Sequence, residues 1–210
     1  MKHLVLMFFA VVCVMSFAGN ALACACCVEA GTYIISTEKP REYVFGILDT
    51  MKFDKEAELY MTEAGFDTIK GLPEVGKEYE SWTADTDQFD VVSEFTKKSW
   101  KFTLKTPGGK TGTLVLTVPA QMVSYKVDIH DTEDTGLGVR LYKEFRFKGT
   151  VQSGTGIFRS SFVRPTTYFL VFQGRGNGCD DVSDFTHWHL EIDSSKAQYE
   201  FNGKLISAAQ

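Results

Sequence analysis

The sequence predicts a mainly β protein that folds as a single antiparallel sandwich or barrel, either without a helix or with one short helix. Apolar and polar residues alternate along most of the chain, and turn-forming residues recur between the alternating segments. Residues 24–210 are a suitable length for one β-rich domain with a sizeable core. Residues 1–23 differ from this domain in composition.

The alternation is clearest in three segments. In SWKFTLK the apolar residues Trp100, Phe102 and Leu104 are separated by polar ones, and residues 141–148 (LYKEFRFK) and 197–203 (AQYEFNG) alternate in the same way. Successive side chains of a strand leave opposite faces of the sheet. The pattern is therefore typical of strands with one buried face.

Two other segments are apolar at consecutive positions, 113–118 (TLVLTV) and 168–172 (YFLVF). Runs of this kind are typical of central strands covered on both faces. Clusters of glycine, proline, serine and asparagine predict turns between strands. They lie at 107–109, 136–138, 153–156 and 202–203.

Residues 54–65 (DKEAELYMTEAG) allow two interpretations. The apolar positions follow the i, i+3, i+4, i+7 spacing of a helix: Ala57, Tyr60, Met61 and Ala64. The same residues also allow a strand through Leu59 and its two successors. Either a strand or one short helix is expected here, and no second helix is expected elsewhere.

The first 23 residues have the parts of a secretory signal peptide. Lys2 precedes an apolar run over residues 4–14, and small residues end in Ala21-Leu22-Ala23. A membrane-spanning helix needs about 20 apolar residues, and this run is interrupted at Ser16. We expect cleavage after Ala23 and export to the periplasm or the extracellular space, and no transmembrane span in the mature chain.

Cleavage leaves four cysteines: Cys24, Cys26, Cys27 and Cys179. An even number of cysteines in an oxidising compartment predicts disulfides. Adjacent cysteines bridge poorly, because a trans peptide holds their Cα atoms at about 3.8 Å. Cys179 is therefore expected to pair with Cys26 or Cys27, and Cys24 with the other, which ties the N-terminus to the 174–179 loop.

Two alternatives for the N-terminal cysteines remain open. Cys24 would be the first mature residue, the position that carries lipid in bacterial lipoproteins, although the usual leucine three residues earlier is replaced by Ala21. Only lipidation of Cys24 would place the protein on a membrane surface. The other alternative is a thiolate site for copper or zinc formed by the Cys-x-Cys-Cys motif.

Residues 184–193 (DFTHWHLEID) predict a strand with two different faces. Trp188, Leu190 and Ile192 would form the apolar face, and His187, His189 and Glu191 the polar face. Two histidines spaced by one residue on a strand reach the same ion, so His187 and His189, with His130 as a third ligand, are candidates to bind zinc or copper. The alternative is an ordinary polar face of a half-buried strand.

The preceding segment FQGRGNGCDD places three glycines around Arg175 and Asn177. Glycines allow a loop to turn its backbone N–H groups toward an anion. Arg175 and Asn177, with Glu191 nearby, are therefore candidate ligand-binding residues. A dinucleotide fingerprint is excluded because no helix pattern follows the glycines.

Composition and motifs argue against several classes of function. The formal net charge of −5 and the absence of a Lys/Arg run argue against a nucleic-acid partner. Motifs of serine hydrolases, zinc proteases and P-loop enzymes are absent from the chain. We expect a non-enzymatic binding or structural role, with a small molecule or protein as partner and an aromatic interior either packed or open to an apolar ligand. The rival hypothesis is a metal-dependent hydrolase built on His187 and His189.

Overall fold

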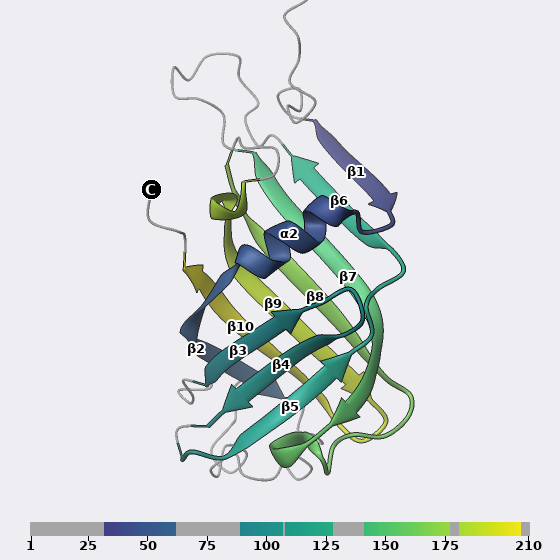
Figure 1. The fold of residues 1–210 in the computed structure, drawn as a ribbon, viewed down its shortest axis with the longest axis vertical. Coiled ribbons are helices and arrows are strands. Elements are labelled where there is room, and N and C mark those ends of the chain that lie inside the picture. Colours follow the sequence, from purple (N-terminus) through teal and green to yellow (C-terminus); the bar gives the residue numbers. More distant parts are fainter. Residues whose placement is uncertain (1–31, 62–88, 107, 128–140, 177–180, 207–210) are drawn as a thin grey trace, which may run out of the picture.

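The computed structural model describes residues 32–61, 89–106, 108–127, 141–176 and 181–206. The described strands form one antiparallel sheet that curls into a nearly closed barrel of eight strands, accompanied by one short helix (Figure 1). This confirms the predicted fold class and favours the barrel over the sandwich.

The elements follow one another along the chain with short connections in most places. They are β1 (Tyr33–Glu38), α2 (Glu42–Thr50), β2 (Lys52–Met61), β3 (Asp90–Phe95), β4 (Trp100–Lys105), β5 (Thr111–Leu116), β6 (Met122–Val127), β7 (Tyr142–Gly154), η1 (Gly156–Phe158), β8 (Thr166–Arg175), η2 (Val182–Asp184), β9 (Phe185–Ser194) and β10 (Gln198–Ile206).

The barrel strands follow the order β2-β10-β9-β8-β7-β5-β4-β3, and all neighbours in this order are antiparallel. The ring closes between β2 and the residue before β3. There Ala57 and Phe89 exchange two backbone hydrogen bonds, each with an N–O distance of 3.2 Å. This reciprocal pair joins the two edges of the eight-stranded sheet.

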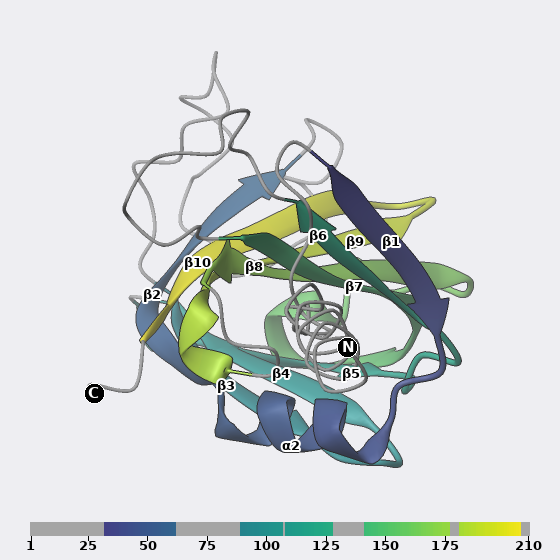
Figure 2. The ribbon, with the colours of Figure 1, turned by 90° about the horizontal axis from the view of Figure 1, so that it is seen from above.

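Strand β7 is long enough to have two partners on the same edge. Residues 151–154 pair with β5, and residues 142–147 pair with β6, which in turn pairs with β1. The sheet therefore branches, and β6 and β1 extend away from the barrel wall (Figure 1). Viewed from above, β1 lies at the outer margin of this extension (Figure 2).

The helix α2 lies against the barrel on the side of β3 (Figures 1 and 2). Its buried side chains, Val44, Ile47 and Leu48, belong to the same hydrophobic core as the barrel interior. The spacing of these residues places them on one helical face. Burial of this face fixes the helix on the barrel.

Aromatic rings fill the middle of the barrel. Among the described residues, eight aromatic core residues are at most 1 % exposed: Phe89, Trp100, Phe102, Phe147, Phe158, Phe172, Trp188 and Phe201. The ring centroids of Trp100 and Phe147 lie 5.0 Å apart, and those of Phe102 and Trp188 lie 5.9 Å apart. Eight-stranded barrels have an interior that side chains can fill, and here large rings occupy it.

Three local predictions need correction. The sequence predicts no helix outside residues 54–65, yet α2 covers Glu42–Thr50; of the two alternatives for residues 54–65, the strand is confirmed over the described part, which belongs to β2. Strand β5 is not covered on both faces, because its burial alternates. β8 comes closer to the prediction, with Leu170, Val171 and Phe172 all buried.

The turn predicted at residues 202–203 is also wrong, because both residues lie inside β10. A Cβ atom on Gly203 would lie only 2.5 Å from the indole Nε1 of Trp188. Gly203 is thus required by close packing against the indole within a strand, and not by a turn.

Candidate binding surface

Strand β9 has the two faces that the sequence predicts. Trp188, Leu190 and Ile192 point into the core and are at most 1 % exposed. His187, His189 and Glu191 lie on the outside of the barrel, where His187 and Glu191 are exposed and His189 is half-buried. The alternation of β9 is therefore confirmed.

The strand register aligns these outer residues with those of neighbouring strands. We use the term outer surface for the outward-facing side chains of β7 to β10. Its rows across the sheet are Glu144–Gln173–His187–Lys204, Arg146–Val171–His189–Asn202 and Lys148–Phe169–Glu191–Glu200. Directly opposed residues of antiparallel strands have Cβ atoms about 4.5–5.5 Å apart, so each row forms one contiguous group.

A hydrogen-bonded network orders the β7 side of the outer surface. The Tyr142 hydroxyl donates to Glu144 Oε1 and lies 3.1 Å from Gln173 Oε1. The Arg146 Nε–H group donates to Glu144 Oε2, and the guanidinium carbon lies 5.2 Å from the centre of the Tyr125 ring. Burial and the neighbouring Glu144 carboxylate raise the pKa of the Tyr142 hydroxyl, so this hydroxyl keeps its proton at neutral pH.

A second polar network surrounds His189. Its Nδ1 lies 2.8 Å from Asn202 Oδ1, and the Asn202 amide nitrogen donates to Glu200 Oε1 over 3.3 Å. Because an amide oxygen only accepts hydrogen bonds, His189 donates from Nδ1. Its Nε2 then faces Glu200 Oε2 at 3.7 Å, and the Phe169 ring lies nearly perpendicular to the imidazole, with the ring centroids 6.5 Å apart.

The predicted metal site is not assembled in the described part of the chain. His187 is exposed and its Nδ1 lies 2.9 Å from the hydroxyl of Thr186. No group of three metal-ligating side chains is found among the described residues, and His130 lies outside them. The zinc or copper hypothesis stays a prediction.

The cysteine predictions fall outside the described residues as well. This holds for Cys24, Cys26, Cys27 and Cys179, and also for Asn177 in the glycine loop. The disulfide pairing, the lipid attachment and the thiolate metal site therefore stay predictions. Of the loop residues singled out, Arg175 is described and is exposed at the end of β8.

The glycines of this loop make room for an ion pair that the sequence analysis missed. A Cβ atom on Gly174 would lie 1.8 Å from the Asp184 carbonyl oxygen, and one on Gly176 would lie 1.7 Å from Asp184 Oδ1. The Asp184 carboxylate pairs with the ammonium group of Lys143, whose side chain is 3 % exposed. The anion next to these glycines is thus a side chain of the protein itself.

A sequence signal for Lys143 exists. It occupies the position between Leu141 and Phe145 in LYKEFRFK, on the face that alternation assigns to the core. A lysine on a buried face requires a partner. Its partner Asp184 is 41 residues away in sequence and carries no comparable local signal.

Charge is unevenly distributed over the outer surface. Arg146, Arg175 and Lys204 lie toward the end where β8 finishes and β9 begins, together with His187 and with one carboxylate, Glu144, which pairs with Arg146. Toward the opposite end, where β9 finishes and β10 begins, lie the carboxylates Glu191, Asp193 and Glu200, in addition to one cation, Lys148. One end of the outer surface is therefore rich in cations and hydrogen-bond donors although the chain as a whole is acidic.

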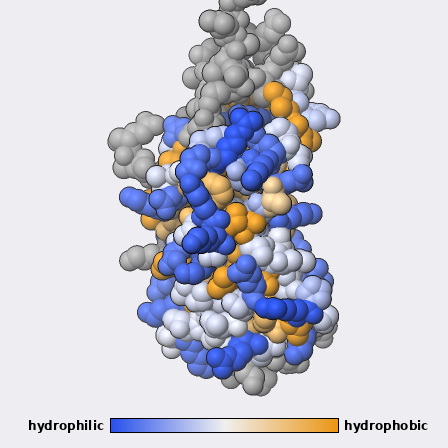
Figure 3. All heavy atoms as spheres, turned by 45° about the vertical axis from the view of Figure 1, so that its right-hand side comes forward, coloured by the Kyte–Doolittle hydropathy of each residue, from blue (hydrophilic) through white to orange (hydrophobic). Residues whose placement is uncertain are grey.

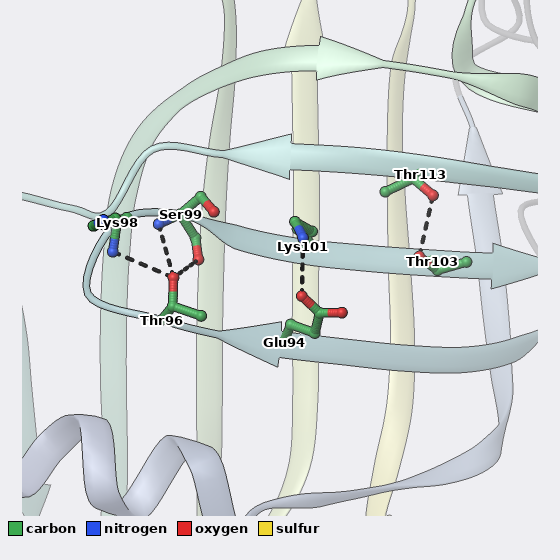
Figure 4. Close-up of polar contacts among 7 residues, drawn as sticks. All are labelled: Glu94, Thr96, Lys98, Ser99, Lys101, Thr103 and Thr113. Atoms are coloured by element: carbon green, nitrogen blue, oxygen red, sulfur yellow. Dashed lines mark hydrogen bonds and ion pairs between the residues drawn. The ribbon is translucent and has the colours of Figure 1, made fainter.

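The outer face of β3 to β5 differs from the outer surface in how its charges are arranged. Its cations are matched to carboxylates across the strands, with Lys101 Nζ 2.9 Å from Glu94 Oε2 (Figure 4). Next to this pair, the hydroxyls of Thr103 and Thr113 lie 3.1 Å apart. This face shows the isolated cross-strand pairs expected of a solvated sheet.

Comparison with protein-family models, with curated proteins and with solved structures finds no match for this chain. None of the helices in the described part of the chain has the length and apolar character needed to cross a membrane.

Proposed function

We propose that this chain is an exported, non-enzymatic binding domain that recognises an anionic ligand on its outer surface. The ligand chemistry that fits is a small molecule or chain bearing carboxylate or sulfate groups. The observation that carries the proposal is the cluster of Arg146, Arg175 and Lys204, with His187, at one end of one face. Export rests on the features of residues 1–23.

The cluster offers several kinds of donor within a short distance. Gln173 stands directly opposite His187, which stands opposite Lys204, and Arg175 is two positions from Gln173 on the same face of β8. Ammonium and guanidinium groups bind carboxylates and sulfates through charge-assisted hydrogen bonds. An anion placed over this row would meet donors from three adjacent strands.

Part of the cluster is already ordered. Arg146 is positioned by Glu144 and by the face of Tyr125, and the Nε–H that Glu144 uses is only one of the five donors of a guanidinium group. Side chains held in place before binding lose less entropy when a ligand arrives. The network around Glu144 therefore favours binding at this surface.

The filled interior supports an outer site over an inner one. The rings at the middle of the barrel are buried and contact each other, as Phe95 does with Trp100 at a centroid distance of 5.2 Å. A ligand entering there would have to displace close-packed side chains, and the contacts that these side chains make with one another would be lost. The outer surface requires no such displacement.

Calorimetric titration with two probes tests the proposal: a sulfated heparin-type hexasaccharide and a hexamer of galacturonic acid. We expect the double variant Arg175→Gln/Lys204→Gln to bind either probe at least tenfold more weakly than the natural protein. The matched control Lys101→Gln/Lys105→Gln changes the net charge equally on the other face and should stay within twofold. Affinity should fall as salt rises, because exposed charges are screened over about 10 Å at 0.1 M.

Two results would contradict the proposal. One is the same loss of affinity in both double variants, which would indicate a response to net charge alone. The other is the absence of binding of both probes by the natural protein at low salt. Lipid attachment at Cys24, if present, would change the location of the protein and leave these expectations unchanged.

A further inference from the structure

We infer that β1 is a self-association edge, which pairs with β1 of a second copy of this chain and extends the sheet across a two-fold axis. β1 lies outside the proposed ligand site, so this pairing does not depend on the proposed function. In the described part of the chain β1 pairs with β6 alone, and it forms the outer margin of the sheet (Figures 1 and 2).

The side chains of β1 are unusually apolar for an exposed strand. Tyr33 is 65 % exposed, Ile34 47 % and Ile35 55 %. Because neighbouring residues point to opposite faces, apolar groups are exposed on both sides of the strand. Hydrophobic residues reach the surface in the part of the molecule that carries β1 (Figure 3).

Between Tyr33 and Thr37 the strand also carries none of the side chains that usually protect a sheet edge. Edge strands generally carry lysine, proline or an inward-pointing charge that prevents pairing with another chain. Tyr33–Thr37 contains none of these. The charged residue of β1, Glu38, lies at its end and forms an ion pair with Arg41 of the same chain at 2.9 Å.

A second short strand, β3, also exposes a β-branched residue, but its neighbours on the same face are charged. Val92 of β3 is 63 % exposed, but it lies between Asp90 and Glu94 on the same face. These carboxylates pair with Lys105 and Lys101 of β4. An exposed β-branched residue surrounded by charges provides a matched control for β1.

We assign the occupant to a second copy because Tyr33–Thr37 is uncharged and largely apolar, so two copies of this segment oppose one another without bringing like charges together. A two-fold axis perpendicular to the sheet makes the two β1 strands antiparallel and keeps each face continuous, so residues of the same face oppose one another. A register centred on Ile35 places Ile35 opposite itself, Tyr33 opposite Thr37 and Ile34 opposite Ser36 of the second copy. Glu38 of each copy then lies beyond the paired segment, at opposite ends.

The expected dimer is weak. A five-residue edge offers much less than the about 1,200–2,000 Å² that stable protein interfaces bury, and two copies of this acidic chain repel one another. Salt screens this repulsion. We therefore expect dimerisation in the range of tens to hundreds of micromolar, about tenfold stronger at 500 mM than at 20 mM salt.

Sedimentation equilibrium of the exported protein tests the assignment. The natural protein should show a monomer–dimer equilibrium, Ile35→Lys should remain monomeric at every concentration, and Val92→Lys should behave as the natural protein. Both substitutions add one positive charge at an exposed β-branched residue, so net charge does not separate them. Dimers that persist in Ile35→Lys, or a natural protein that is monomeric throughout, would overturn the inference.

Cysteine cross-linking tests the register. At the two-fold axis the Cα atoms of residue 35 would lie about 4.5–5.5 Å apart, within the range of a disulfide. The two copies of residue 33 would be offset by four residues, about 14 Å along the strands. Under mild oxidation, peptide mapping should find a 35–35 link in Ile35→Cys and no 33–33 link in Tyr33→Cys. Equal linking at both positions, or none at 35, contradicts the register.

A foreign strand at the same edge would give a different result. In that case the natural protein would sediment as a monomer and would bind an added extended peptide of the β1 sequence, with Ile35→Lys abolishing the binding. This outcome would assign the edge to another partner and would overturn the inference of a dimer.

Discussion

Lys143 and Asp184 show how single residues shape the loop that the sequence marks as glycine-rich. Breaking a buried ion pair by removing one partner costs about 3–5 kcal/mol, because the other charge stays buried. The two groups pair only because Gly174 and Gly176 leave space around Asp184. The glycines therefore act on stability through the ion pair they accommodate.

Gly176→Ala tests this link between the glycine and the ion pair. The new Cβ would lie 1.7 Å from Asp184 Oδ1, so the carboxylate has to move away from Lys143. We expect a loss of roughly 3 kcal/mol in the free energy of unfolding, measured by urea denaturation. The control Gly46→Ala lies in α2 with no atom within 4 Å of the added Cβ, and it should raise stability by about 0.5–1 kcal/mol. Equal effects of both substitutions would contradict the explanation.

The elements divide into those that local pattern predicts and those that distant contacts decide. Alternation predicts β4 and β9 because each has one face in the core and one in solvent. β2 has a helical spacing as well, and its pairing with β10, more than 130 residues later in the chain, decides in favour of a strand. Alternation predicts which residues of β7 to β10 face outward. It does not predict which of them lie side by side on the outer surface, because that depends on the register of four strands.

The helix α2 was missed for a local reason. Val44, Ile47, Leu48 and Met51 have helical spacing, but Gly46 interrupts the segment and valine and isoleucine favour strands. The apolar face of the helix becomes decisive only when the barrel is present to cover it. Burial in the tertiary structure, and not intrinsic propensity, therefore accounts for this helix.

Leu48→Ala tests how far burial stabilises α2. Leu48 is 1 % exposed, and truncation of such a residue removes apolar contacts and leaves a cavity, with an expected loss of about 2–5 kcal/mol. Asp49→Ala changes the next residue, which is exposed, and should alter stability by less than about 0.5 kcal/mol. Urea denaturation followed by far-ultraviolet circular dichroism measures both. Similar losses in the two variants would indicate that the helix is held by something other than its buried face.

The barrel interior is tightly packed, but the amount of backbone pairing differs from one pair of neighbouring strands to the next. Between β8 and β9 the described register runs from Thr166 to Gly174 and pairs nearly every residue. At the junction of β2 and β3, the described backbone contact is the reciprocal pair of Ala57 and Phe89. Local opening requires less free energy where fewer hydrogen bonds and contacts must break together. The barrel should therefore open first along this seam, while the aromatic core and β7 to β10 stay intact.

Hydrogen exchange followed by NMR tests this order of opening. The amides of Ala57 and Phe89 should exchange at least tenfold faster, relative to their intrinsic rates, than the paired amides of Leu170 in β8 and Leu190 in β9. As urea is added below the unfolding transition, exchange at Leu170 and Leu190 should accelerate with the slope of global unfolding, and exchange at the seam should stay nearly constant until the two rates merge. This follows because seam opening exposes little surface. Protection of Ala57 equal to that of Leu190 at every urea concentration would show that the barrel opens as one cooperative unit, and that the seam is as stable as the strands opposite it.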